Sequence, residues 1–291
     1  RRGKRAPVMA APGAAGEAAR SILVTGASSG IGLALCKQLV IEEGCRVFLG
    51  SRDPAKGAAA IASMGLPEEA AARVSVVQID VGSDESVEAA AAAVKELLGG
   101  SPLYALVNNA GAGLNTALSS ANVLNTNWYG TKRACDAFLP LLDPAAGRIV
   151  NVGSGSGGIY VRGLGQTDEA RLLMKGEATF EEIDAYVRAN SGSGAADYGL
   201  SKAAVAAYTQ HLARAHPGIL SSCVSPGFID TAMTRGYGAG TKPEGGTRSI
   251  RHCLFAELDG NGWYYGSDAL RSPYHLMRNP GQPPYDGVMP F

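Results

Sequence analysis

The sequence lacks several features by which large classes of protein are recognised. It has no excess charge of either sign, because 26 lysines and arginines balance 26 aspartates and glutamates among its 291 residues. A neutral chain gives no electrostatic reason to expect a nucleic acid or an anionic membrane as partner. No apolar run approaches the roughly 18 to 20 residues that span a bilayer. We therefore expect no nucleic-acid partner and no membrane span.

Cysteine and histidine are also sparse. The five cysteines are odd in number and form no C-x-x-C pair, which argues against a disulfide framework and for free thiols in a reducing compartment. The four histidines contain no pair at the spacing of metal ligands. The sequence therefore predicts no metal site.

The first 20 residues differ from the rest of the chain. They are basic and rich in Ala, Gly and Pro, and Glu17 is their single acid. Such a stretch is typical of a disordered tail, and equally of the remnant of an organelle transit peptide. The expected location is thus the cytoplasm or, with a transit peptide, the plastid stroma. Residues 21–291 are long enough for one large domain.

A strand, a glycine-rich turn and a helix are expected at the start of this domain. Residues 21–25 are an apolar run, and Ile31, Leu35 and Leu39 recur at helical spacing. Between them stands Gly26-Ala-Ser-Ser-Gly30-Ile-Gly32. Glycines there allow a tight turn and a close approach to a pyrophosphate, which the N–H groups of the helix N-terminus would bind. A flexible loop without a ligand is the alternative, and the flanking strand and helix argue against it.

Further apolar runs alternate with helical patterns along the chain. Strands are expected at residues 46–49, 74–79, 103–107, 147–152, 219–224 and 263–265. Long helices are expected over residues 121–142 and from Tyr198 to His216, and an amphipathic helix is expected over residues 179–189. The chain after Thr231 has no clear helical pattern. This alternation predicts an α/β fold: a Rossmann-type, doubly wound parallel sheet of about seven strands with helices on both faces, in a single domain.

The end of the second strand bears on the cofactor. In this fold an acid there binds the 2′-hydroxyl of the adenosine ribose, whereas an arginine suits a 2′-phosphate. No acid precedes Arg52, and Asp53, followed by Pro54, is more simply the N-cap of a helix. The sequence therefore favours NADP(H) over NAD(H).

Tyr198 and Lys202 lie one helical turn apart. An ammonium near a phenol stabilises the phenolate and lowers its pKa, which would suit proton exchange with an alcohol or carbonyl oxygen. When such a pair occurs without other motifs, the alternative is a pair without a catalytic role, in which the tyrosine packs and the lysine is solvated. Ser154 follows the fifth strand, where open α/β sheets bind ligands, and Asn127 is a polar residue within a predicted helix.

Taken in order, these features resemble the short-chain dehydrogenase/reductase family over residues 21–265. The matching motifs are Thr25-Gly26-x3-Gly30-x-Gly32, Asp80, Asn108-Asn109-Ala110-Gly111, Asn127, Ser154, Tyr198-x3-Lys202 and Pro226-Gly227-x3-Thr231. The segment from Asn127 to Cys135 and an insertion over residues 155–197 resemble the carbonyl-reductase branch. In that branch the insertion covers the surface that other members use for dimerisation, so the resemblance implies a monomer.

The resemblance also implies a role for each motif. Tyr198 would donate a proton to the substrate carbonyl, Lys202 would lower its pKa and bind the nicotinamide ribose, Ser154 would stabilise the oxyanion, and Asn127 would hold a water of a proton relay. The residues expected to contact NADPH are Gly26, Ser28, Ser29, Gly30, Ile31, Gly32, Arg52, Asp80, Val81, Asn108, Ala110, Gly111, Tyr198, Lys202, Pro226, Gly227 and Thr231.

Two positions depart from the family pattern. Ser29 stands where NADP-preferring members often have a cation, so the expected preference for NADPH depends mainly on Arg52. Gly153 stands where a second serine is common. The expected activity is reduction of a small carbonyl compound (an aldehyde, ketone or quinone) by NADPH. An alcohol dehydrogenase working in the oxidative direction, and a dinucleotide-binding subunit with a structural role in a larger assembly, are the alternatives.

Overall fold

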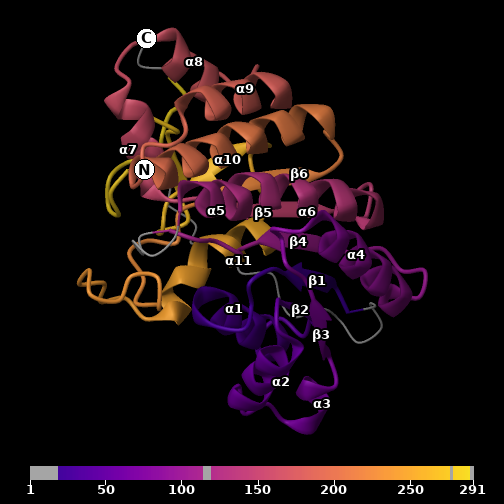
Figure 1. The fold of residues 1–291 in the computed structure, drawn as a ribbon. Helices are drawn as coiled ribbons and strands as arrows, with labels where there is room; N and C mark the ends of the chain where they lie inside the picture. The colour runs from indigo at the N-terminus through magenta and orange to yellow at the C-terminus, as the bar shows by residue number, and fades with distance from the viewer. Residues whose placement is uncertain (1–18, 114–118, 276–277, 289–291) are drawn as a thin grey trace, which may run out of the picture.

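An eight-stranded sheet runs through the centre of the computed structural model, which describes residues 19–113, 119–275 and 278–288 (Figure 1). The strand order is β3-β2-β1-β4-β5-β6-β7-β8, and all neighbours are parallel except β7 and β8. The strands are β1 (Ser21–Val24), β2 (Arg46–Ser51), β3 (Val74–Gln78), β4 (Ala105–Asn108), β5 (Arg148–Val152), β6 (Leu220–Val224), β7 (Trp263–Tyr265) and β8 (Arg271–Ser272). The order reverses between β1 and β4, so the ligand crevice of such a sheet is expected at their carboxyl ends.

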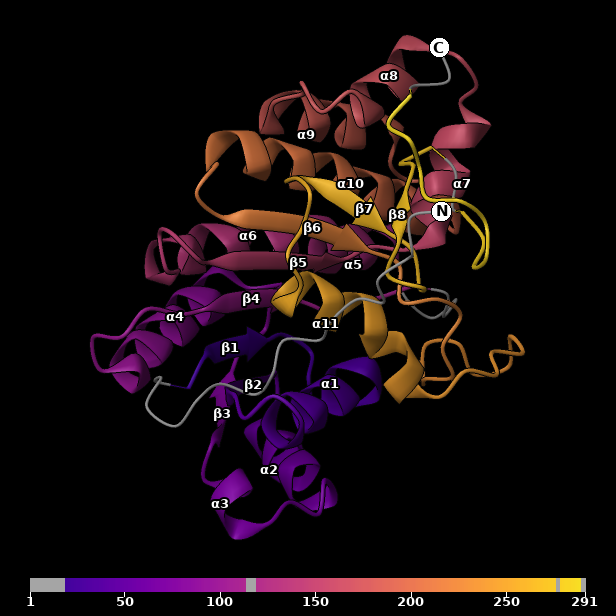
Figure 2. The ribbon, with the colours of Figure 1, turned by 180° about the vertical axis from the view of Figure 1, so that it is seen from behind.

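Helices cover both faces of the sheet, which confirms the predicted doubly wound architecture (Figure 2). They are α1 (Gly30–Ile41), α2 (Pro54–Ser63), α3 (Glu68–Ala71), α4 (Asp84–Leu98), α5 (Ser120–Leu124), α6 (Gly130–Phe138), α7 (Gly155–Gly163), α8 (Asp168–Met174), α9 (Phe180–Asn190), α10 (Ala196–Ala215) and α11 (Arg248–Phe255). Within the described ranges, no helix has the length and apolar character needed to cross a bilayer.

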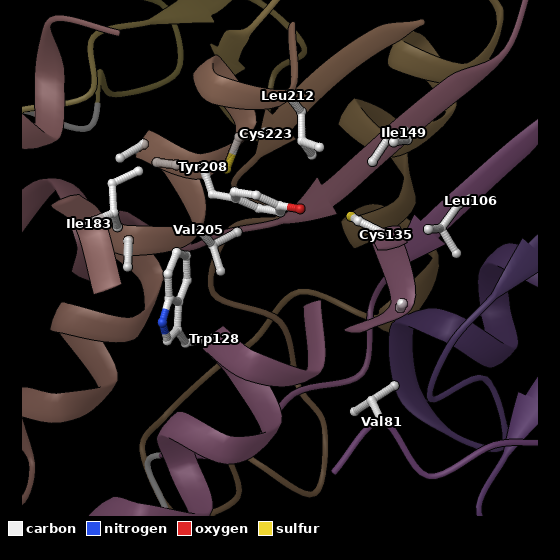
Figure 3. Packing of buried hydrophobic residues seen from close by; sticks show 14 of the residues in the cluster. Val81, Leu106, Trp128, Cys135, Ile149, Ile183, Val205, Tyr208, Leu212 and Cys223 are labelled. Carbon is white, nitrogen blue, oxygen red and sulfur yellow. The ribbon is translucent and has the colours of Figure 1, made fainter. Parts of the chain in front are cut away.

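The two cores follow from the alternation of side chains along each strand. In β1, Leu23 belongs to one core, while Ile22 and Val24 belong to the other. The first core packs against α4, α6 and α10, and the second against α1, α2 and α11. Trp128 and Tyr208 are fully enclosed in the first core, with their rings edge to face at a centroid distance of 5.7 Å (Figure 3). The helices that carry the candidate site are therefore fixed by continuous packing.

Local signals explain where several helices begin. The Asp53 carboxylate accepts hydrogen bonds from the backbone N–H groups of Ala55 (2.9 Å) and Lys56 (3.3 Å), which confirms the predicted N-cap of α2. In the insertion, Thr179 and Glu182 form a capping box at the start of α9. The helix predicted over residues 179–189 is thus present as Phe180–Asn190.

The expected single helix over residues 121–142 is wrong. The chain instead forms α5, a π-helical turn at Asn125–Tyr129, α6 and a 3₁₀ turn at Leu139–Leu141. The wide turn coincides with Asn127, whose side chain is bonded to the backbone of a different segment. Single π turns of this kind are frequent at functional sites.

Three further differences concern elements with weak sequence patterns. The chain after Thr231 contains the unpredicted helix α11, which buries Ile250, Cys253 and Leu254. The two-residue strand β8 raises the strand number from about seven to eight. Helices α7 and α8 were not expected either, because α7 contains four glycines.

The predicted tail lies outside the described residues up to position 18.

Candidate active site

The predicted catalytic residues come together from three elements at the carboxyl end of the sheet. Tyr198 and Lys202 lie in the first two turns of α10, Ser154 follows β5 and caps α7, and Asn127 lies in the π turn. A Cβ placed on Gly111 would be 3.6 Å from the Asn127 Oδ1 atom and 3.8 Å from the Lys202 Nζ atom. Gly111 therefore marks the point at which the π turn and α10 approach each other.

Lys202 is buried, with 7% of its surface exposed. Its Nζ atom donates a hydrogen bond to the Val152 carbonyl oxygen at 2.7 Å and lies 5.8 Å from the centre of the Tyr198 ring. Burial lowers the pKa of Lys202 to about 8. The ammonium therefore still predominates at neutral pH, in a place where little water screens it.

The expected lowering of the Tyr198 pKa is not observed. Burial raises the pKa of this phenol, and a hydrogen bond with the Ser154 side chain opposes the rise only in part. Desolvation disfavours the phenolate, and the Lys202 ammonium is directed at the Val152 carbonyl. Tyr198 is accordingly a protonated phenol at neutral pH, and it can donate a proton.

Both polar atoms of the Asn127 side chain are hydrogen-bonded to other protein groups. Its Oδ1 atom accepts a hydrogen bond from the Ala112 N–H, and its Nδ2 atom donates to the Ala112 carbonyl oxygen, both at 2.8 Å. The Nδ2 atom also donates to the Ser201 hydroxyl at 3.0 Å, which in turn donates to the Tyr198 carbonyl oxygen at 2.7 Å. Both N–H groups of this amide are therefore used within the protein, and the side chain holds the Ala112 segment against α10.

A neighbouring glycine was missed by sequence reasoning. Gly113 has a φ of +136°, and a Cβ placed on it would lie 2.2 Å from the Cδ2 atom of Tyr198. The segment that Asn127 holds therefore packs directly against the Tyr198 ring. No local signal identified Gly113, because the contact joins residues 85 positions apart, and its neighbours at 114–118 lie outside the described residues.

The glycine turn is held by residues that the motif contains but that we did not assign. The Asn109 Nδ2 atom donates to the carbonyl oxygens of Thr25 (2.9 Å) and Gly26 (3.1 Å), and the Thr25 hydroxyl accepts from the N–H groups of Asn109 (3.1 Å) and Ala110 (3.0 Å). A Cβ on Gly32 would lie 2.6 Å from the Asn109 Nδ2 atom. Gly26, with a φ of +62°, and Gly32 thus allow the turn to pack against the end of β4.

The start of α1 has the chemistry of an anion site. Ser29 is the N-cap residue, but its side chain makes no capping hydrogen bond, so the N–H groups of the first turn remain available. Ser28, Gly30 and Ile31 are partly exposed here. A Cβ on Gly30 would lie 3.2 Å from the Thr231 Cγ2 atom, so the loop that begins with Pro226-Gly227 closes against the turn. This arrangement fits the phosphates of a dinucleotide.

The side chain of Asn108, one of the residues predicted to contact the cofactor, is directed into the core. Its Nδ2 atom donates to the Asn151 Oδ1 atom at 2.8 Å and contacts the Cys135 sulfur at 3.2 Å, inside the core. Asn151 continues the network to the Thr209 hydroxyl at 2.9 Å. Successive residues of a strand point to opposite faces, so Asn108 is turned inward whereas Asn109 reaches the glycine turn.

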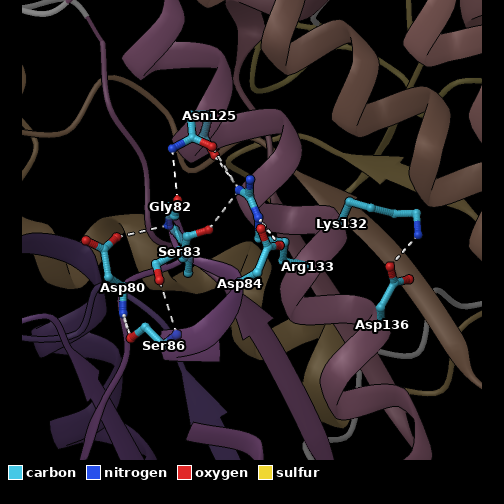
Figure 4. A network of polar contacts seen from close by, with 10 residues as sticks. Asp80, Gly82, Ser83, Asp84, Ser86, Asn125, Lys132, Arg133 and Asp136 are labelled. Carbon is cyan, nitrogen blue, oxygen red and sulfur yellow. Dashed lines mark hydrogen bonds and ion pairs between the residues drawn. The ribbon is translucent and has the colours of Figure 1, made fainter. Parts of the chain in front are cut away.

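Three further residues that are predicted to contact the cofactor, Arg52, Asp80 and Val81, lie just beyond the carboxyl ends of β2 and β3. Arg52 is exposed at the end of β2. Asp80 accepts a hydrogen bond from the Gly82 N–H at 2.9 Å, and its own N–H donates to the Ser86 hydroxyl at 2.9 Å (Figure 4).

The same loop is fixed to the π turn. The Asn125 amide donates to the Gly82 carbonyl oxygen at 3.0 Å and accepts from an Arg133 N–H at 2.9 Å (Figure 4). Arg133 in turn pairs with Asp84 at 2.6 Å. The end of β3 and the segment that carries Asn127 are thus joined in one polar network.

The insertion is fastened to the same π turn. The buried Trp128 indole donates to the Asp184 carboxylate of α9 at 3.1 Å, and its ring stacks on Phe180 at a centroid distance of 5.3 Å. Burial favours the neutral form of Asp184, but hydrogen bonds from Trp128, Arg188 and Tyr129 together lower its pKa. The insertion is therefore anchored next to Asn127.

We expect Asp184→Ala to lower the free energy of unfolding by about 2 kcal/mol, because it leaves the Trp128 N–H buried without an acceptor. Asp168→Ala is the matched control, because Asp168 pairs with Arg171 on the surface with 94% of its side chain exposed, and such pairs contribute about 0–1 kcal/mol. Urea unfolding of both variants measures the difference. Equal losses would show that the Trp128–Asp184 contact is no anchor.

Among the described residues, no group of His, Cys, Asp and Glu side chains could hold a metal ion.

Comparisons with known proteins agree with this geometry. Residues 20–165 match the family model described as short chain dehydrogenase. The chain is 31% identical to a (+)-neomenthol dehydrogenase of Arabidopsis thaliana over 277 residues, which cover 82% of this chain and 92% of that protein. Among solved structures, it resembles salutaridine reductase from Papaver somniferum, with a TM-score of 0.72 and 28% identity over 84% of this chain and 99% of that one. It also resembles an NADPH-bound carbonyl reductase from chicken fatty liver, with a TM-score of 0.64 and 26% identity over 88% and 99% of the two chains.

Proposed function

Since the chain belongs to the short-chain dehydrogenase family and is an oxidoreductase, we propose that it reduces an aldehyde, ketone or quinone to an alcohol with NADPH. The observation that carries this proposal is the buried Tyr198 phenol, hydrogen-bonded to Ser154 and one helical turn from the Lys202 ammonium. The NADPH-bound carbonyl reductase that the chain resembles supports the choice of reaction and cofactor.

Each side chain has a defined task in this proposal. Tyr198 donates a proton to the carbonyl oxygen, and the Ser154 hydroxyl stabilises the negative charge that develops there. Lys202 supplies a positive charge beside the phenol and a donor for the nicotinamide ribose. Asn127 acts by positioning the Ala112 segment and Ser201. NADPH, when bound, supplies the hydride.

The proposed cofactor site consists of the glycine turn and the surrounding strand ends. The first turn of α1 offers its N–H groups to the pyrophosphate, and Arg52 offers a cation to the 2′-phosphate. Asp80 and Val81 line the adenosine side, while Ala110, Gly111 and Thr231 border the turn itself.

The raised pKa of Tyr198 favours reduction over the alternative, oxidation of an alcohol. Reduction needs a protonated phenol at the start of the reaction, whereas oxidation needs a phenolate. A purely structural role in a larger assembly gives no reason for this set of polar groups to be brought together. We further propose a monomer, because α7, α8 and α9 lie beside α10 and cover part of its outer surface (Figure 1).

A spectrophotometric screen tests the activity directly. Oxidation of NADPH and of NADH is followed by its change in absorbance over a panel of aldehydes, ketones and quinones. We expect turnover of at least one carbonyl class with NADPH. Absence of turnover over the whole panel, together with stable co-purification with a partner, would favour the structural alternative.

We expect Arg52→Gln to raise the KM for NADPH by about 10- to 100-fold, because one charge-assisted contact contributes about 1.5–3 kcal/mol. The KM for NADH should change by less than about twofold, since NADH has no 2′-phosphate. Lys56→Gln is the control, because Lys56 is an equally exposed cation four residues further on. An equal rise of both KM values in Arg52→Gln would exclude the assigned phosphate contact.

A further inference from the structure

A cavity lies at the β7–β8 edge of the sheet, away from Tyr198. It has a volume of about 390 Å³ and is formed by the end of α8, the last turns of α10, β7, β8 and the chain near Tyr285. Gln210 in its wall is 12 residues beyond Tyr198 on α10, which corresponds to roughly 18 Å along the helix axis. Ligand cavities have volumes of about 300–1,000 Å³, so this one suits a small molecule.

The charges that line this edge cavity have one sign. Lys175, Arg214 and Arg271 contribute permanent positive charge, and no Asp or Glu is among the lining residues. In the described part of the chain, no carboxylate forms an ion pair with any of the three. Asp286 directly follows the lining residue Tyr285, but it is exposed and accepts a hydrogen bond from the Val288 N–H. The cavity therefore attracts an anion.

Flat aromatic rings form another part of the wall. The Arg271 guanidinium lies 3.8 Å from the centre of the Trp263 ring and 5.2 Å from that of Tyr285. Stacking engages the faces of a guanidinium, whereas its N–H groups point outward in the plane and suit a carboxylate. The Tyr274 ring also lines the cavity. The wall of the cavity therefore combines a cationic group with the faces of aromatic rings.

The wall also contains a buried donor without an acceptor. The Gln210 Nε2 atom is inaccessible to solvent and makes no hydrogen bond within the described residues. Its Oε1 atom is next to Gly176, where a Cβ would be 2.5 Å away. A buried donor without a partner is unfavourable, so this part of the wall contains an uncompensated polar group.

We propose that the edge cavity binds a small aromatic carboxylate, with Arg271 and Lys175 recognising the carboxylate and the aromatic wall recognising the ring. Both parts of the ligand follow from the wall: a charge alone would leave the rings unused, and a neutral ring would leave three cations unpaired. This site is separate from the one proposed for carbonyl reduction and does not depend on it.

Isothermal titration with 2-naphthoate, in the presence of saturating NADPH, tests the proposal. We expect one equivalent to bind, whereas 2-naphthamide (the same ring without the charge) and inorganic phosphate (charge without a ring) bind at least about tenfold more weakly. Arg271→Gln and Lys175→Gln should each weaken binding about tenfold. Lys95→Gln, which removes an exposed lysine of α4, should leave binding unchanged.

Lys175 is exposed, so its substitution tests the site even if Arg271→Gln disturbs the fold. The proposal is overturned if 2-naphthoate does not bind, if the amide or phosphate binds equally well, or if neither substitution weakens binding. It is also overturned if a carbonyl substrate found in the activity screen competes with 2-naphthoate, because the ring would then lie in the catalytic site.

Discussion

Tyr198→Phe is expected to lower kcat by about 10³-fold, since a positioned general acid contributes roughly 10²–10⁴-fold to a rate. The substitution removes the phenol hydroxyl and keeps the ring that packs against Gly113. The fold and the glycine turn should therefore be unaffected, and the Kd for NADPH should stay within about threefold, because the ring still occupies its place. Steady-state kinetics and a fluorescence titration with NADPH measure the two quantities.

Tyr160→Phe is the control for this prediction. Tyr160 shares a hydrogen bond of 3.1 Å with the Tyr186 hydroxyl, and its side chain lies beside Gly199, next to Tyr198 in the chain. Deleting its hydroxyl removes one neutral hydrogen bond, so we expect less than about a fivefold change in kcat. If Tyr198→Phe retains more than a tenth of the wild-type activity, Tyr198 is not the proton donor.

Gly113→Ala is expected to lower kcat by about 10²-fold, because a misplacement of about 1 Å in a reacting group can have an effect of that size. The new Cβ would lie 2.2 Å from the Tyr198 Cδ2 atom and 2.8 Å from its Cε2 atom. Either the ring or the backbone from Ala110 to Gly113 must move, and Asn127 holds that backbone by two hydrogen bonds. The ring is therefore displaced from its position beside Ser154.

Gly100→Ala separates steric displacement from backbone strain. Gly100 also has a positive φ, +91°, but a Cβ on it would meet no atom within 4 Å. We expect Gly100→Ala to lower the free energy of unfolding by about 1 kcal/mol without changing kcat, because strain at such a position costs about 1–3 kcal/mol. Kinetics and urea unfolding of both variants distinguish the effects. Unchanged kcat in Gly113→Ala would mean that the ring position is not critical.

The order of the strands β1 to β7 could be predicted because it depends on local patterns. The apolar run of each strand, the Asp53 cap of α2 and the apolar face of α9 are each encoded in a short stretch of sequence. The pairing of Tyr198 with Lys202 also follows from helical spacing alone. Such features need no knowledge of what the segment packs against.

The features that could not be predicted from the sequence depend on contacts between distant segments. The π turn forms where Asn127 bonds to Ala112, fifteen residues earlier, and no helical pattern encodes that partner. The pKa of Tyr198 could not be judged from spacing, because it is raised by burial, which depends on the surrounding chain. Asn108 and Asn109 are identical in type, and only the direction of each side chain from the strand separates their roles.

The link between Trp128 and α9 has a consequence for changing the enzyme's specificity. Because α9 is held by a buried indole and a carboxylate, its attachment does not depend on the flanking loops alone. The loops on either side of α9 contain Gly176, Gly192 and Gly194, all with positive φ. Loop-exchange libraries that keep Trp128, Phe180 and Asp184 should therefore give folded proteins with altered pockets, which makes this insertion a starting point for redesign.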